Sequence, residues 1–496
     1  MLVVRKRGPP NKHAQKAPRQ LVGSPRILSS NNVSISPSES NNGRQSTTPL
    51  QSPEVLGHMD RSATCICSGL SSKWLSAFAP EPIIMRLLGD WFNVIHPLAP
   101  ILLRRRFLQR LQQGVADSNA EFCGLVISVC AATKATLPRG DYGPVTVDYC
   151  VDFLDAHGLL KSQFTRDSFS MDRCIALYNI GTAMSATTKS GLSSMRAYHA
   201  LSEAAAGARY LAYYRIHERD EAEQQLLRRL IWLLFASACA DIFGRLPISL
   251  LSQDRIETFP RPLPLSDNQM EPKALNSCHE PPWHGDDTTY VPGLNSLSDL
   301  FLIWQEVQQV PEGTEPQSTI MRNLAKIQQV LDNLPPELRW RGGLSRPANV
   351  TEGHDVQIAN LFVTSLNIRS NILQKFGPTD KSAEDHQKII DDLLEILYHL
   401  PRAVFDANGS SLVPKIRDIG AAYLEQLGSG VGEVEIGDAR IKLERLLRKL
   451  DDLDCWQGID IRSLTSDLSR FYPNFGCPAM KNAAAIRRDL GQFLLG

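Results

Sequence analysis

The sequence predicts an all-α protein in which one large multi-helix domain follows a disordered N-terminal segment. Three observations predict this fold. From about residue 81 onward, apolar residues recur at helical spacing and helix-forming residues dominate. The alternation of apolar and polar residues that is typical of strands is almost absent. Before residue 81 the chain is rich in Ser, Pro, Asn and Gln and has no sustained apolar period, so it cannot offset the entropy of ordering.

The predicted disordered segment, residues 1–80, begins with a basic stretch. Phosphate-contacting arms and nuclear-import signals have this composition, whereas the alternative is a solvated tail without a role. Contacts to phosphates carry no sequence information, so we do not expect the stretch to select a DNA sequence unaided. Its basic residues, which with Arg26 precede the first acidic residue Glu39, are Arg5, Lys6, Arg7, Lys12, Lys16 and Arg19.

Residues 81–496 are predicted to form the helical domain. Pro and polar residues concentrate in a long loop near 255–295, and an acidic, Gly-rich connector covers 428–438. The apolar period predicts helices over roughly 99–114, 119–134, 144–157, 170–188, 193–213, 220–243, 296–310, 317–333, 354–376, 383–400, 408–427, 437–452 and 480–494.

The helix at 220–243 is expected at the centre of the core, flanked by the helix at 193–213. The flanking helix carries an apolar stripe and a run of small residues, Ala204 to Ala208, which lets another helix approach closely. The central helix is apolar nearly all round in its second half, as a buried helix is. We expect three of its side chains to be nearly fully buried: Leu230, Trp232 and Leu234.

Composition and charge are those of an average soluble globular protein. The chain is 43% hydrophobic and 21% charged, and its formal net charge of zero gives no whole-chain attraction to nucleic acid or to an anionic membrane. Most of the ten cysteines lie in apolar runs, which indicates buried thiols in a reducing compartment. There is no apolar signal-peptide core, and the longest apolar run is about half a membrane span. We therefore expect an intracellular protein that does not associate with a membrane.

The segment Leu226–Phe235, with its adjacent arginines, tryptophan and phenylalanine, resembles the middle homology region of the fungal zinc binuclear cluster transcription factors. Three other segments resemble family motifs and occur in the family's order. They are Trp91-Phe92 before this segment, the Gly-Arg-Leu-Pro turn after it, and Leu334–Leu338 further along the chain. The resemblance runs from about residue 85 to 425. Ala238 and Cys239 depart from it, because the family often has an acidic residue and an Arg there. The motif residues of the central match are Arg228, Arg229, Trp232, Phe235, Arg245 and Pro247.

The resemblance implies a nuclear regulator of RNA polymerase II genes, in carbon catabolism or a secondary-metabolite pathway. The helical domain of such a protein is a regulatory domain that acts through an effector or through protein partners, namely the transcription machinery or co-regulators. A homodimer is also compatible with the family. A regulatory partner that never binds DNA is the alternative function, and a helical enzyme is a distant third.

The cysteine pattern departs most from that family, whose members bind promoter DNA through six cysteines that hold zinc. No cysteine precedes Cys65, and Cys65 and Cys67 have one residue between them and no partner pair. We therefore expect no zinc cluster and no cofactor in this chain. Because Arg5–Asn11 resembles the basic linker that follows the family's zinc cluster, either a zinc-binding module that contacts promoter DNA is missing before it, or the protein is a variant without one.

The pair Arg228 and Arg229 beside Trp232 has two interpretations. Charge next to an aromatic ring is compatible with nucleic-acid contact. We favour the second interpretation, in which Trp232 packs in the core, because aromatic residues on apolar helices are usually buried. One arginine then either extends its charged end to water or pairs with a nearby acid such as Glu223.

No catalytic or metal-binding residues are predicted. His279, Trp283, His284, Asp286 and Asp287 lie in the Pro-rich loop, where metal ligands would lack stiff support. The acidic run at 451–454 has no second acidic motif that would complete a magnesium site. The sequence also contains no phosphate-binding Gly-rich loop, no Gly-x-Ser-x-Gly and no His-Glu-x-x-His. We therefore do not expect an enzyme.

Overall fold

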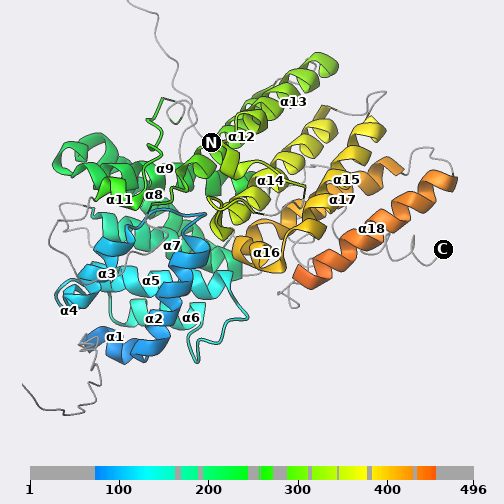
Figure 1. The fold of residues 1–496 in the computed structure, drawn as a ribbon. Coiled ribbons are helices and arrows are strands. Elements are labelled where there is room, and N and C mark those ends of the chain that lie inside the picture. The colour runs from blue at the N-terminus through cyan, green and yellow to red at the C-terminus, as the bar shows by residue number, and fades with distance from the viewer. Residues whose placement is uncertain are drawn as a thin grey trace, which may run out of the picture. The chain divides into compact units, whose positions relative to one another are not determined.

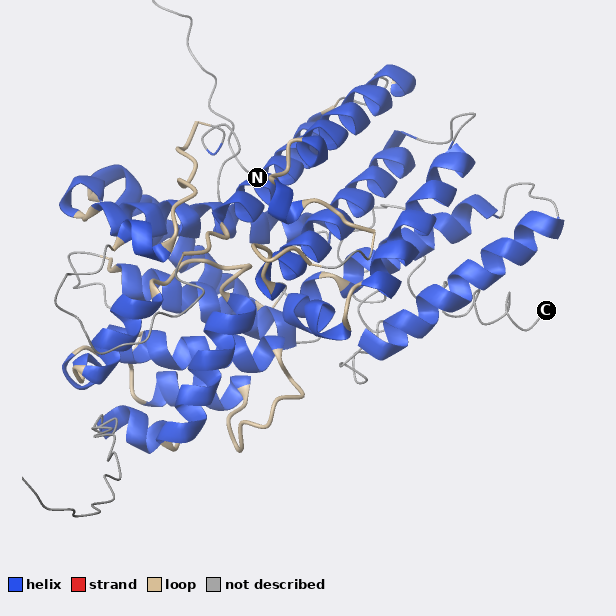
Figure 2. Ribbon diagram, viewed as in Figure 1, coloured by secondary structure: helices blue, strands red, loops and turns tan. Residues whose placement is uncertain are grey.

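A computed structural model describes residues 73–161, 169–187, 194–243, 256, 258–271, 287–310, 315–342, 346–376, 382–427 and 433–453. These residues are 79% helical and contain no strand (Figure 2), so the all-α prediction is confirmed. The basic stretch, the turn with Arg245 and Pro247, and the expected helix at 480–494 lie outside the described residues. In the ranges above, no helix has the length and apolarity that crossing a membrane requires.

The first group of helices surrounds α5, whose side chains are buried on every face over most of its length. The α5 helix packs against α2, α6 and α7, α7 packs against α8, and α8 against α9 (Figure 1). The Asn119 side chain caps α5 by accepting a hydrogen bond from the backbone N–H of Phe122 at 3.0 Å. The group comprises α1 (Lys73–Phe78), α2 (Glu81–Asp90), the π-helical turn η1 (Trp91–Ile95), α3 (Arg104–Gln112), α4 (Val115–Ser118), α5 (Ala120–Thr136), α6 (Val147–Ala156), α7 (Met171–Thr187), α8 (Met195–Tyr214), the short 3-10 helix η3 (Ile216–Glu218) and α9 (Glu221–Phe243).

The second group of helices surrounds α14, which contacts α12, α13, α15, α16 and α17. The α12 helix also packs against α9, and it contributes Phe301 to the hydrophobic core of the first group and Leu300 to that of the second. The elements are α12 (Val291–Gln309), α13 (Pro316–Asp332), the 3-10 helix η4 (Pro336–Leu338), α14 (Glu352–Phe376), α15 (Ser382–His399), α16 (Arg402–Asn408), the 3-10 helix η5 (Gly409–Ser411), α17 (Val413–Leu427) and α18 (Glu433–Leu453). The short α11 (Asp267–Met270) belongs to the first group, where Met270 packs against the core and Asp267 accepts a hydrogen bond from the backbone N–H of Arg104.

Several segments differ from the sequence prediction, including the predicted loop near 255–295, which contains the short helix α11 and the first turn of α12. The helix expected over 408–427 is divided, because Gly409 adopts a positive φ of 56° that ends α16, and α17 then starts at Val413. Helices α1 and α2 were not expected. They form because Leu75, Phe78 and Ile84 bury their side chains against the first core, so tertiary contacts stabilise segments that are too short to be helical alone.

The predicted core of α9 is confirmed. Leu230, Trp232 and Leu234 are each 0% exposed, and α8 packs against this helix as expected. The small residues of α8 also allow α7 to pack closely against this helix. A Cβ atom built on Gly207 would lie 2.7 Å from Cys174 Sγ, so only glycine fits there without displacing the neighbouring helix.

Candidate functional site

A pocket of about 230 Å³ lies where the two hydrophobic cores meet. Its walls come from η1, α5, α7, α9 and α12 on one side and from α14, α16, η5 and α17 on the other. Most of the wall is apolar and includes Ala132, Ala183, Leu233 and Phe301. Because helices distant in sequence supply the lining, the pocket exists only in the assembled domain.

One lysine of α17 lines this pocket. Lys415 is 4% exposed, and its Nζ donates a hydrogen bond to Thr364 Oγ1 of α14 at 2.8 Å. Asn360 Oδ1 lies 3.5 Å from the same nitrogen and 3.2 Å from Thr364 Oγ1, and the amine also lies 5.8 Å from the centre of the Phe301 ring. These partners are neutral. No carboxylate among the described residues forms an ion pair with the amine.

The electrostatics of the pocket are dominated by this amine. Burial lowers the pKa of Lys415 to about 7, because the ammonium form loses its hydration and gains no opposite charge. The other ionisable lining residue is Tyr178, whose pKa is raised by burial, so that its hydroxyl stays neutral near pH 7. A protein that holds an amine in this way carries either a destabilising positive charge or a neutral base at pH 7.

Asn408 adds an unsatisfied acceptor to the same lining. Its Nδ2 donates to the backbone oxygens of Val404 and Val356, at 2.8 and 3.1 Å. These two bonds determine the orientation of the amide, since the opposite orientation would place an oxygen against two carbonyls. Asn408 Oδ1 is then buried without a hydrogen-bond partner among the described residues. The residues that line the pocket therefore include one buried amine and one amide whose oxygen is unsatisfied.

The motif residues of α9 hold the segment 258–271 against the helix. Arg229 is 1% exposed and donates hydrogen bonds to the backbone oxygens of Pro100 and Leu265, at 3.1 and 2.8 Å. Burial lowers its pKa to about 10. The Trp232 Nε1 donates to Pro260 O at 3.1 Å, and the Arg261 guanidinium lies 3.7 Å from the centre of the indole ring. These contacts make both residues structural, and neither side chain is displayed for nucleic acid.

Phe235 belongs to the core, whereas Glu223 does not pair with either of the adjacent arginines. Phe235 is buried and packs edge-on against Trp232, with ring centres 5.5 Å apart. The expected pairing of one of the adjacent arginines with Glu223 is wrong. Glu223 instead lies 3.8 Å from Arg106 of α3 and 3.6 Å from Arg219, which directly follows η3. The Nε of Arg228 is buried and makes no hydrogen bond with a described residue.

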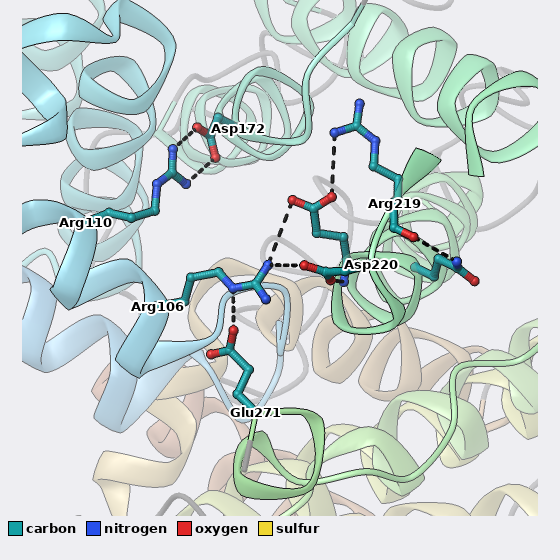
Figure 3. Close-up of polar contacts among 8 residues, drawn as sticks. Arg106, Arg110, Asp172, Arg219, Asp220 and Glu271 are labelled. Atoms are coloured by element: carbon teal, nitrogen blue, oxygen red, sulfur yellow. Dashed lines mark hydrogen bonds and ion pairs between the residues drawn. The ribbon is translucent and has the colours of Figure 1, made fainter. Parts of the chain in front are cut away.

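An ionic cluster at the surface joins α3 to three other segments (Figure 3). Arg106 contacts Glu271 through Nε and Asp220 at 3.1 Å, while Arg110 donates two hydrogen bonds to Asp172 of α7, at 2.9 and 2.5 Å. The side chain of Arg106 is 30% exposed, so its pair with Asp220 contributes only about 0–1 kcal/mol to stability. We interpret the cluster as a structural connection between helices.

The described part of the chain shows no sign of thiol chemistry or of a metal site. Burial raises the pKa of the Cys123, Cys150 and Cys174 thiols to about 12, so these thiols are unreactive at neutral pH. No group of three or more His, Cys, Asp or Glu side chains that could hold a metal ion occurs within the described ranges. Of the polar loop cluster, only Asp287 is described, and its carboxylate accepts a hydrogen bond from Asn268.

Sequence reasoning did not single out Lys415. The signal was present, since Lys415 falls on the apolar stripe formed by Leu412, Ile416 and Ile419, where a lysine is unusual. That stripe faces the core in the structure, and the Lys415 side chain is buried with it.

Comparison of the chain with protein-family models, with curated proteins and with solved structures gave no match.

Proposed function

We propose that this chain is a nuclear regulator of RNA polymerase II transcription, whose helical domain responds to a small effector bound in the pocket beside Lys415. Two features support the proposal. The motif residues resemble, in order, the middle homology region of fungal zinc-cluster regulators. The pocket lies against α9, the helix that carries the central motif, and Leu233 of that helix lines it. The presence of this pocket beside Lys415 is the main reason to propose that the domain responds to an effector.

The composition of the pocket supports recognition of a small molecule. Ligand sites combine an apolar wall with a few polar groups that orient the ligand, and this lining supplies an amine, amides and hydroxyls in such a wall. A bound molecule would contact helices of both hydrophobic cores at once. It would therefore stabilise the arrangement in which the two groups of helices are packed together, as any ligand stabilises the state that it binds. Co-regulators or the transcription machinery would bind the liganded and unliganded forms of the domain with different affinity.

A tethering experiment tests the regulatory role. The full chain is fused to a heterologous DNA-binding module upstream of a reporter gene in a fungal host, and reporter output is measured on several carbon sources. We expect the fusion to change output several-fold relative to the module alone, and the change to depend on the carbon source. The same fusion, tagged with a fluorescent protein, should accumulate in the nucleus.

Matched variants connect the response to the pocket. Ala183 is buried and lines the pocket, so Ala183→Leu should fill part of it and remove the dependence on carbon source. Ala206 is exposed on α8, so Ala206→Leu should leave the response unchanged. A fusion that alters reporter output on no carbon source, although it is expressed and nuclear, would refute the regulatory function.

A further inference from the structure

The buried amine of Lys415 has hydrogen-bond acceptors but no counter-charge among the described residues. An ammonium ion uses three N–H donors, and Thr364 and Asn360 together accept two of them, the second at the marginal distance of 3.5 Å. Burying an unpaired charge is costly, whereas a charge paired with a carboxylate in the same surroundings is stabilised. The position therefore favours a ligand that supplies a negative charge.

The size of the pocket limits the body of that ligand. An engineered cavity of about 150 Å³ binds benzene, and drug-sized ligands occupy about 300–1,000 Å³. A volume of 230 Å³ lies between these values. It holds roughly one aromatic ring or a short hydrocarbon chain together with one small polar group. The alanine and leucine side chains of the wall match such an apolar body.

The pocket has one cationic side chain, and this number favours a carboxylate over a phosphate as the anionic group of the ligand. Phosphate carries nearly two negative charges at neutral pH and is usually bound by several donors, such as arginines or a row of backbone N–H groups. This lining supplies a single cationic group. A carboxylate carries one charge and only accepts hydrogen bonds, so it complements one ammonium.

We propose that this pocket binds a small monocarboxylate with an apolar body, whose carboxylate pairs with the Lys415 ammonium. The proposal deepens the proposed function, on which it rests for its regulatory meaning, by naming the chemical class of the effector. Binding has a chemical consequence. The unliganded amine is about half protonated near pH 7, and the carboxylate favours its protonated form, so the complex takes up a proton as it forms.

Titration calorimetry of the purified full chain tests the proposal directly. The probes are benzoate, phenylacetate and hexanoate, with benzamide as the neutral analogue of benzoate. We expect at least one carboxylate to bind at millimolar concentration or below, and benzamide to bind much more weakly. Repeating the titration near pH 7 in buffers of different ionisation enthalpy should reveal the uptake of a fraction of a proton for each ligand bound.

Variants of Lys415 separate recognition from folding. Lys415→Met keeps the length of the side chain without its charge and should weaken carboxylate binding by at least about thirtyfold, because one member of a buried charge pair is lost. Lys415→Gln, which can still hydrogen-bond to Thr364, serves as a second neutral variant if the first does not fold. Lys326 forms an exposed ion pair with Glu306, so Lys326→Met should bind as the parent chain does.

The outcomes distinguish this proposal from the regulatory one. Equal binding of benzoate and benzamide, unchanged binding by both neutral Lys415 variants, or no binding of any of the three carboxylates at millimolar concentration would each overturn the carboxylate assignment. Carboxylate binding with the expected loss in the variants, together with a silent reporter, would leave the pocket assignment standing and remove only the transcriptional role.

Discussion

Replacing Lys415 by methionine should change how the stability of the protein depends on pH. Burial lowers the pKa of this amine from 10.5 to about 7. Between these two values the unfolded chain binds more protons at residue 415 than the folded chain does, so raising the pH favours folding. Below about pH 7 the amine is charged in both states, and the folded state carries the full cost of the buried charge.

The size of the effect follows from the two titration curves. Within this window a single group contributes at most about 1.4 kcal/mol per pH unit. At pH 7, the lower end of this window, the amine of the folded state is still half protonated. The titration of Lys415 therefore raises the free energy of unfolding by about 2 kcal/mol between pH 7 and pH 9. Methionine retains the apolar stem but cannot titrate. The free energy of unfolding of the parent minus that of Lys415→Met should therefore rise by about 2 kcal/mol over this range.

Urea unfolding followed by circular dichroism at several pH values measures this difference. Lys326→Met is the matched control, because its exposed pair with Glu306 should have little influence on stability. The parent and the control should keep a nearly constant difference across the range, while the Lys415→Met curve converges toward the parent curve or falls below it at high pH. Parallel curves for the parent and Lys415→Met would refute the reasoning, because they would mean that the buried amine has an ordinary pKa.

Four further variants test packing and the N-terminal stretch. Trp232→Ala should lower the free energy of unfolding by about 3–5 kcal/mol through the cavity that it leaves, and an unchanged denaturant midpoint would contradict the buried position of the indole. Gly181→Ala should cost about 1–3 kcal/mol, because the new Cβ would lie 2.6 Å from Leu201 Cγ, as measured by thermal unfolding. Gly89→Ala has nothing within 4 Å of its new Cβ and should stabilise α2 slightly, so equal effects of the two alanines would argue against the close contact of α7 with α8. Without a zinc cluster, the chain should bind duplex DNA weakly and without sequence preference, through the basic stretch, and deletion of residues 1–28 should abolish this binding in a low-salt titration. A salt-resistant complex that selects one promoter fragment would show that the helical domain reads DNA itself.

Much of the fold could be predicted because local patterns and tertiary packing agree. The second half of α9 is apolar all round, and this alone indicates that Leu230, Trp232 and Leu234 are buried. The division between α16 and α17 was missed, because the helical period continues across residues 408–412 and only the positive φ of Gly409 interrupts it. Helices α1 and α2 were missed for the opposite reason, since segments this short are stabilised by contacts that only the folded domain supplies.

The candidate site was less predictable than the fold. The adjacent arginines and the tryptophan were singled out as a motif, yet the groups that Arg229 and Trp232 bind are backbone carbonyls of Pro100, Pro260 and Leu265. A backbone carbonyl is present at every residue, so no sequence pattern identifies which one an arginine will reach. For Lys415, its place on an apolar stripe was visible, but the absence of a neighbouring carboxylate among the described residues depends on which helices pack beside α17.

By itself, the sequence determined the helical fold class and the buried faces of the helices, because the spacing of apolar residues along a chain sets which side chains share a face of a helix. Only the tertiary structure decided that Lys415 lines a pocket between two cores and that its amine has neutral partners. The physical reason is that the cost of burying a charge depends on every group within a few ångströms. The groups beside this amine come from α12 and α14, which are distant from α17 in sequence and are brought to it by folding.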